Sequence, residues 1–251
     1  MRIVSLCPSL TELVFALERG DELVGVTEWC VHPRPAVDAI EKLGGTKNPK
    51  VARIAELAPD VVLMNNEENR REDAEALARA GVRVLSTFPR DVQDTAEMVR
   101  EIGAALERRR EAERIARDIE QRSRRVRDTA RGLSEVRWAY LIWRKPYMSV
   151  NRDTFVDAMF RLAGGVNVFG AHEARYPEIQ VAELTAADPQ RVFLCTEPFP
   201  FESEHADELA RASGLPRERF VIADGELLSW HGSRTPAGID YAESLIREAR
   251  G

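Results

Sequence analysis

Short apolar runs alternate with amphipathic segments along the first 90 residues. The apolar runs have the length of buried strands, and the segments between them repeat apolar residues at the spacing of helices. Such alternation is typical of a parallel sheet covered by helices. Strands are expected at 2–6, 22–26, 61–64 and 82–85, and helices at 10–17, 49–57 and 70–80. Ser9 and Glu12 fit a capping box at the start of the first helix.

The segment from 91 to 134 has a different character. It contains no proline and is rich in arginine, glutamate and alanine. Helical spacing of its apolar residues predicts two consecutive helices, the second over about 109–131. At 1.5 Å per residue, that helix would span about 35 Å. We expect a helical linker that lies across the surface or bridges two lobes, with a coiled-coil arm as the alternative.

From 135 to 251 the alternation of strands and helices resumes. Strands are expected at 136–142, 190–195 and 219–223, and helices at 153–163, 202–213 and 236–250. The two halves also share an order of parts: a glycine pair, a helix, a proline, a strand and an acidic loop. We therefore expect two α/β, Rossmann-like lobes with parallel sheets, residues 1–90 and 135–251, joined by the long helix. Ligands of open parallel sheets bind beyond the carboxyl ends of the strands, which predicts a ligand cleft between the lobes.

Composition narrows the class of protein. The chain has 251 residues, of which 44% are hydrophobic, and this composition argues against disorder. Its formal charge of −6 argues against nucleic-acid binding. No apolar run approaches the roughly 20 residues of a membrane span. The N-terminal residues lack the apolar stretch of a secretory signal, so we expect a cytoplasmic protein. Three widely spaced cysteines predict neither a disulfide framework nor a structural zinc site.

Aromatic residues gather in the loops that follow the predicted strands. Three of the four tryptophans fall there with two tyrosines: Trp29, Trp143, Trp230, Tyr147 and Tyr176. Such a group suits a large, flat, partly apolar ligand held by stacking. A single loop tryptophan more often packs on its own lobe, so the prediction depends on the five together.

The same loops carry the candidate polar ligand-binding residues, which are Cys30, His32, Thr46, Glu67, His231 and Arg234. His32 and His231 are the candidates for coordinating a metal, or a metal carried by the ligand. Arg234 suits a carboxylate, a phosphate or an amide oxygen. Each of these residues also has an ordinary role as a hydrogen-bonding or solvated loop residue.

Catalytic motifs are missing from the chain: it has no nucleophile elbow, P-loop, dinucleotide fingerprint or zincin motif. Cys30 and His32 are close in sequence, which is weak evidence for a nucleophile and its base. We therefore expect a binding protein rather than an enzyme.

Residues 2–12 (Arg-Ile-Val-Ser-Leu-Cys-Pro-Ser-Leu-Thr-Glu) resemble the opening of the helical-backbone metal receptors, class III periplasmic-binding-protein-like proteins that serve importers of cobalamin, siderophores and haem. The glycine pairs 44–45 and 164–165 and the segment 57–62 fit as well. The resemblance is strongest to the cobalamin-binding branch. It implies two lobes on a rigid helix, no catalysis, and a corrinoid lined by aromatics at positions matching Trp29, Tyr176 and Trp230.

Two departures from that family change the expected function. The first departure is the signal that exported members carry, which the N-terminal residues here do not resemble. The second concerns docking, because exported members dock on an importer through one surface glutamate per lobe. The positions of those two glutamates correspond here to Ala52 and Ala182, with Glu56 and Glu183 nearby. Loss of both charges would remove the contacts that orient docking. The resemblance therefore implies a cytoplasmic, non-catalytic binder of cobalamin or a related corrinoid that does not feed an importer.

Three alternatives stay open. The first is a receptor for haem, a ferric siderophore or a metal ion, and the second is an enzyme that acts on a corrinoid or metal complex through Cys30 and His32. That enzyme would need a lowered thiol pKa. The third is an interaction protein that works through the long helix, which its thin apolar stripe does not favour.

Overall fold

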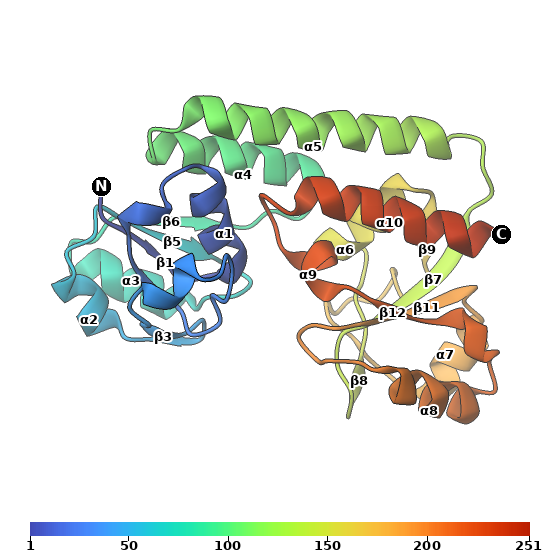
Figure 1. Ribbon diagram of the computed structural model, residues 1–251. Helices are drawn as coiled ribbons and strands as arrows, with labels where there is room; N and C mark the ends of the chain where they lie inside the picture. The colour runs from blue at the N-terminus through green and yellow to red at the C-terminus, as the bar shows by residue number, and fades with distance from the viewer. The chain divides into compact units, whose positions relative to one another are not determined.

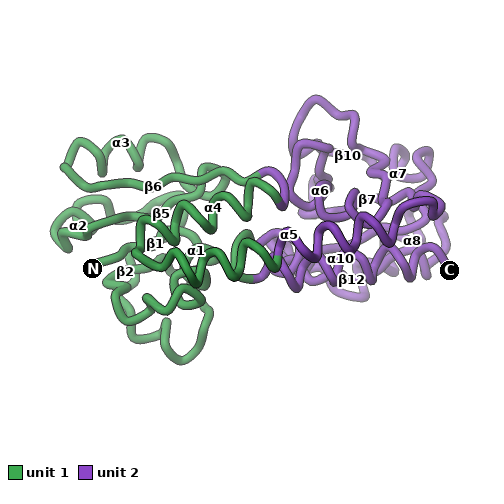
Figure 2. Tube along the Cα trace, turned by 90° about the horizontal axis from the view of Figure 1, so that it is seen from above, with its two compact units in different colours: residues 1–89, 93–118, 231–233 green, residues 90–92, 119–230, 234–251 purple.

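The computed structural model describes all residues from Met1 to Gly251. The chain forms two compact units, drawn in different colours in Figure 2. Unit 1 comprises residues 1–89, 93–118 and 231–233, and unit 2 comprises 90–92, 119–230 and 234–251. The long helix α5 (Arg109–Ala130) contributes residues to both units. No helix is long and apolar enough to cross a membrane.

Unit 1 is built on a four-stranded parallel sheet in the order β2-β1-β5-β6 (Figure 1). Its strands are β1 (Ile3–Ser5), β2 (Leu23–Val26), β5 (Val61–Asn65) and β6 (Val84–Thr87). Its helices are α1 (Pro8–Ala16), α2 (Val51–Glu56), α3 (Arg71–Arg79) and most of α4 (Val92–Ala105). A short antiparallel pair, β3 (Gly44–Gly45) and β4 (Asn48–Pro49), and the 3-10 turns Gly20–Glu22 and Ala36–Ala39 complete it.

The core of unit 1 follows from the alternation of side chains along its strands. Val4 of β1, the adjacent Leu6, and Val62 and Met64 of β5 pack against helix side chains of α2 and α3. Helix α4 lies on the opposite face of the same sheet (Figure 1). Because both faces are covered, the strands read as nearly continuous apolar runs.

Unit 2 repeats this architecture with a parallel sheet in the order β12-β11-β7-β9. Its strands are β7 (Val136–Leu141), β9 (Gly165–Asn167), β11 (Arg191–Cys195) and β12 (Phe220–Ala223). Its helices are α6 (Phe155–Leu162), α7 (Val181–Ala187), α8 (Ser203–Ser213), α9 (Gly225–Ser229) and α10 (Thr235–Arg250). A small antiparallel pair joins β8 (Tyr147–Met148) to β10 (Glu178–Ile179), and Arg217–Arg219 forms a 3-10 turn.

Aromatic rings fill the α6 side of this second sheet. The Phe160 ring stacks on Phe193 with centroids 4.8 Å apart and contacts Trp138 at 4.7 Å. On the other face, Leu141 and Leu194 belong to the apolar cluster that includes side chains of α7 and α8. The sheet is therefore buried on both sides, as in unit 1.

The two sheets share one connection order. If the four strands of each sheet are numbered 1 to 4 in the order in which they occur along the chain, they lie side by side in the order 2-1-3-4 in both units. This confirms the repeat that the glycine pairs and prolines predicted. It also confirms two Rossmann-like α/β lobes with parallel sheets.

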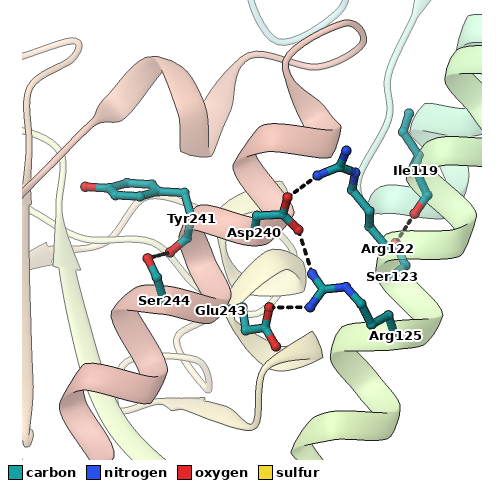
Figure 3. Close-up of polar contacts among 8 residues, drawn as sticks. All are labelled: Ile119, Arg122, Ser123, Arg125, Asp240, Tyr241, Glu243 and Ser244. Carbon is teal, nitrogen blue, oxygen red and sulfur yellow. Dashed lines mark hydrogen bonds and ion pairs between the residues drawn. The ribbon is translucent and has the colours of Figure 1, made fainter.

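Within unit 2, ion pairs tie α5 to α10 (Figure 3). Arg125 donates to Asp240 at 2.6 Å and to Glu243 at 2.8 Å, and Arg122 also contacts Asp240. Within unit 1, α4 and α5 approach closely because Gly103 faces the buried Ala112. Glu113 accepts hydrogen bonds from Arg100 and Arg117, each at 2.7 Å, beside that contact.

Two predicted helix starts are wrong. Ser9 does not cap α1: the helix begins at Pro8 after Cys7, and the Ser9 hydroxyl lies 3.3 Å from the Cys7 sulfur. Proline fits the first turn because its missing N–H has no helical partner there. Helix α6 is capped by Thr154, whose side chain accepts from the Asp157 amide, rather than starting at residue 153. The pattern also missed the short elements β3, β4, β8, β9, β10 and α9, and it gave no bounds for the helix between the second glycine pair and Pro189, which is α7.

Candidate functional site

The parallel strands of unit 1 end at one edge, and the loops there carry its candidate residues. Trp29 follows β2 and has 63% of its surface exposed, so it presents an open aromatic side chain. Its indole nitrogen lies close to Gly45, where any side chain would crowd it. Phe88 follows β6 and is also exposed. This edge of unit 1 therefore has apolar aromatic surface available to a ligand.

Cys30 lies in the same loops but is buried. Its sulfur accepts a hydrogen bond from the Thr11 hydroxyl at 3.1 Å and lies 3.1 Å from that of Thr27. The Thr11 hydroxyl also lies 2.9 Å from that of Ser5. Burial raises the pKa of the Cys30 thiol. An enzyme that uses this thiol would need the opposite shift, so the structure contradicts the requirement of that alternative.

A hydrogen-bonded turn follows β5. The Asn69 amide donates to the Leu6 and Thr46 carbonyls at 2.9 and 3.0 Å, and its oxygen accepts from the Asn65 N–H. Thr46 is nearly buried, and the ammonium of Lys47 donates to the Glu67 carbonyl at 2.7 Å. The structure thus brings the Thr46 and Glu67 loops together. The two asparagines that do so were not among the predicted site residues.

The two histidines proposed as metal ligands occupy different settings. His231 is 8% exposed, whereas His32 is partly exposed in a proline-rich loop. Nowhere in residues 1–251 do three or more His, Cys, Asp or Glu side chains form a group that could hold a metal ion.

The corresponding edge of unit 2 carries a second group of aromatic residues. Trp143 is 41% exposed, and its ring meets Phe199 edge-on at 5.8 Å. Trp143 and Tyr147 lie on one hairpin, since Trp143 bridges to Met148. Tyr176 is partly exposed, with the Arg175 guanidinium 5.9 Å from its ring centroid. Phe199 was not predicted, although it follows β11 in the same way that Trp143 follows β7.

Trp230 does not offer the open stacking face that its loop position suggested. It is 7% exposed, and its indole N–H donates to Glu197 at 2.7 Å. The Arg234 guanidinium lies 4.7 Å from its ring centroid and pairs with Glu226 at 2.7 Å. Trp230 therefore orders its neighbours in this state of the protein. A direct role in ligand binding stays a prediction.

Three arginines of these loops are paired with carboxylates of unit 2. Arg144 contacts Glu208 at 2.5 Å, and Arg175 contacts Asp153 at 3.0 Å. Arg234 pairs with Glu226, as described above. Their positive charges are thus largely compensated before any ligand arrives, which lowers the attraction of this edge for an anion.

The positions that correspond to the docking glutamates are exposed. Ala52 lies on α2 and Ala182 on α7. Of the two nearby carboxylates, Glu183 accepts from the Gln180 N–H at 2.6 Å and completes the capping box of α7. Glu56 pairs with Arg53 at 3.1 Å. Both carboxylates are therefore engaged within their own helices or helix starts.

Known proteins resemble this chain over most of its length. A vitamin B12-binding protein of Vibrio parahaemolyticus is 26% identical over 76% of this chain and 70% of its own length. A vitamin B12-binding protein of Vibrio vulnificus is 25% identical over 95% of this chain and 87% of its own length. The crystal structure of the periplasmic vitamin B12-binding protein of Vibrio cholerae has a TM-score of 0.86 at 22% identity, over 99% of this chain and 97% of that one. A periplasmic haem-binding protein of Pseudomonas aeruginosa has a TM-score of 0.83 at 25% identity, over 98% and 92%.

The family itself is assigned from the sequence. Residues 3–221 match the periplasmic binding protein family, which covers most of both units. Members of this family bind solutes and are not enzymes, and the resemblance carried by residues 2–12 and the two glycine pairs is confirmed. The chain belongs to the periplasmic binding protein family.

Proposed function

We propose that this protein is a non-catalytic binding protein for cobalamin or a related corrinoid. The candidate ligand-binding residues lie in the loops at the carboxyl edge of the parallel sheet in each unit. The observation that carries the proposal is the combination of exposed aromatic side chains with compensated arginines at these loops.

The aromatic residues account for the apolar part of such a ligand. Trp29 in unit 1 and Trp143 in unit 2 expose large parts of their rings, and Tyr147 and Tyr176 are partly exposed. A corrin ring is broad and largely apolar on its faces, so stacking and burial would supply most of the binding energy.

The charges account for the choice between ligand classes. Haem and ferric siderophores carry carboxylates or other anionic groups, whereas the peripheral side chains of cobalamin are mostly neutral amides. Arg144, Arg175 and Arg234 each pair with a carboxylate of unit 2, so their positive charges are largely compensated. This compensation weakens the attraction for an anion, so a neutral, amide-bearing ligand fits better. The vitamin B12-binding relatives support the same choice.

Absence of catalysis is part of the proposal. Cys30, the candidate nucleophile of these loops, is buried, and burial raises the pKa of its thiol. The family supports solute binding.

Calorimetry of the purified protein with cyanocobalamin tests the proposal. We expect saturable binding of one ligand per chain. A parallel titration with haemin tests the second candidate, which the haem-binding structural relatives favour. Saturable haemin binding without cyanocobalamin binding would replace the corrinoid by haem, and binding of neither would refute both.

Independence from an importer is a further part of the proposal. Ala52 and Ala182 stand where the docking glutamates are expected, and Glu183 is engaged in a helix cap. Stimulation of a cognate importer in vesicles would contradict this part. The cytoplasmic location also stays a prediction, and cell fractionation with an antibody against the native protein tests it.

A further inference from the structure

The loop between β11 and α8 carries two phenylalanines that are separated by one residue. Phe201 is buried in the core of unit 2, whereas Phe199 is partly exposed and packs against that core. The Phe201 N–H donates to the Phe199 carbonyl at 2.9 Å and to the carbonyl of Cys195, the last residue of β11, at 3.3 Å. The two rings meet edge-on with centroids 4.7 Å apart. Phe199 is therefore the outer ring of a loop that is anchored in the core.

His205 supports this loop from the first turn of α8. Its Nδ1 accepts a hydrogen bond from the backbone N–H of Glu202 at 2.9 Å, which fixes the orientation of the imidazole. The imidazole meets the Phe199 ring edge-on at 5.4 Å and the Phe201 ring edge-on at 5.8 Å. Only 12% of the His205 side chain is exposed. One side chain thus combines a cap at the helix start with a ring contact to both phenylalanines.

Phe199 also contacts Trp143, the exposed candidate for stacking on a ligand. Their rings meet edge-on with centroids 5.8 Å apart. The next residue, Arg144, pairs with Glu208, which lies three positions after His205 on α8. Side chains three positions apart in a helix share a face. The same face of α8 therefore supports the Trp143 hairpin at two points, through the Arg144 ion pair and through Phe199.

We propose that His205 is a positioning residue that, through Phe199, holds the Trp143 ring in the orientation in which it stacks on the ligand. The stacking on the ligand rests on the proposed function above, whereas the orientation of Trp143 does not. A ring held by an edge-on contact has fewer orientations to lose than a free exposed ring, so part of the ordering cost is removed before the ligand arrives. The alternative is that His205 acts only as the cap of α8.

Two substitutions separate the ring from the cap. His205→Gln removes the ring, and a glutamine at the third position of a helix can still accept from the cap N–H. His205→Phe keeps an aromatic ring but has no acceptor for the Glu202 N–H. His172→Gln is the matched control, because the His172 ring meets Phe169 edge-on at 5.8 Å in the same unit. Thermal unfolding verifies that each variant is folded.

The first readout needs no ligand. The protein is labelled with 5-fluorotryptophan, and the fluorine resonance of Trp143 is assigned from its loss in Trp143→Phe. The second readout is the dissociation constant for cyanocobalamin, measured by calorimetry at neutral pH. It is measured for each variant alone and for His205→Gln in a Trp143→Ala background. In that background the stacking ring is already absent, so a positioning residue has nothing left to hold.

We expect His205→Gln to shift or broaden the Trp143 resonance and to weaken cyanocobalamin binding by about three- to tenfold, the worth of one aromatic pair. His205→Phe and His172→Gln should leave both readouts close to those of the native protein. In the Trp143→Ala background, His205→Gln should cause no further loss of affinity.

The inference is overturned if His205→Gln leaves the Trp143 resonance or the affinity unchanged, or if His205→Phe disturbs both as much as His205→Gln does. The second of these results would assign His205 to the helix cap alone. If the native protein does not bind cyanocobalamin, the proposed function fails, and the fluorine resonance still decides whether His205 positions Trp143.

Discussion

Replacing Gly103 by alanine sets two physical effects of opposite sign against each other. Gly103 lies inside α4, where alanine stabilises a helix by about 1 kcal/mol relative to glycine. A Cβ at this position, however, would lie 2.1 Å from the Cβ of Ala112 on α5 and 3.1 Å from the Arg108 carbonyl oxygen. Carbon atoms in contact sit about 3.5–4.0 Å apart, so the two helices would have to separate by more than 1 Å.

The structure predicts that the steric effect wins. Overpacking of this kind costs about 1–3 kcal/mol, and Ala112 is fully buried, so it has no open space to move into. After the helix-propensity gain of about 1 kcal/mol, we expect Gly103→Ala to lower the free energy of unfolding by up to about 2 kcal/mol. Urea denaturation followed by far-UV circular dichroism measures this change.

Exchanging the two residues, with Gly103→Ala and Ala112→Gly combined, isolates the energy of the contact between α4 and α5. Ala112→Gly alone loses helix propensity and a buried methyl group, about 2 kcal/mol together. The double variant restores one methyl group between the helices, so we expect it to lie within about 1 kcal/mol of the native protein instead of at the sum of the two losses. Additive effects, or a Gly103→Ala variant as stable as the native protein, would refute the reasoning.

Three further predictions concern the ligand, the ion pairs and pH. Trp143→Ala should weaken cyanocobalamin binding by about 1–3 kcal/mol in calorimetry, because it removes an exposed stacking surface. Leu133→Ala removes an exposed side chain before β7 and should leave binding unchanged. Asp240→Asn should lower the free energy of unfolding by less than about 1 kcal/mol in urea, and 1 M salt should remove the difference, because its arginine pairs are partly exposed. The two arginines beside Glu113 lower its carboxyl pKa from 4.5 to about 2, so their stabilisation is present above pH 4.5 and lost as the pH falls towards 2. Glu113→Gln should therefore unfold at a lower temperature than the native protein at pH 6, with no difference near pH 2.

Much of the fold could be predicted because its signals are local. The strand β7 and the helix α5 were expected within one residue of their observed ends, since each depends on the spacing of its own apolar residues. The capping serine could not be placed from its motif alone, because Pro8 starts the helix one residue earlier. Short elements such as β8 were missed since two residues carry no periodicity, and their partner strand lies far away in sequence.

The positions of the candidate residues relative to the strands could be predicted, whereas their contacts could not. Aromatic residues do follow the strands, and Trp29 and Trp143 are exposed as a binding surface requires. The indole of Trp230, however, is hydrogen-bonded to Glu197, a partner 33 positions earlier in the chain. The Cys30 sulfur likewise contacts Thr11, 19 positions away. Such pairings form only when the sheet assembles, so residue type and loop position could not reveal them.

The burial of all three native cysteines makes the protein convenient to turn into an optical sensor. Cys7, Cys30 and Cys195 expose 3%, 1% and 0% of their surface, and burial raises the thiol pKa of Cys7 and Cys195 to about 12. Thiol-reactive dyes need an accessible thiolate, so the native chain should take up almost no label at neutral pH. A single cysteine introduced on an exposed loop would then carry the only fluorophore, and its emission would report ligand binding without any native thiol having to be removed.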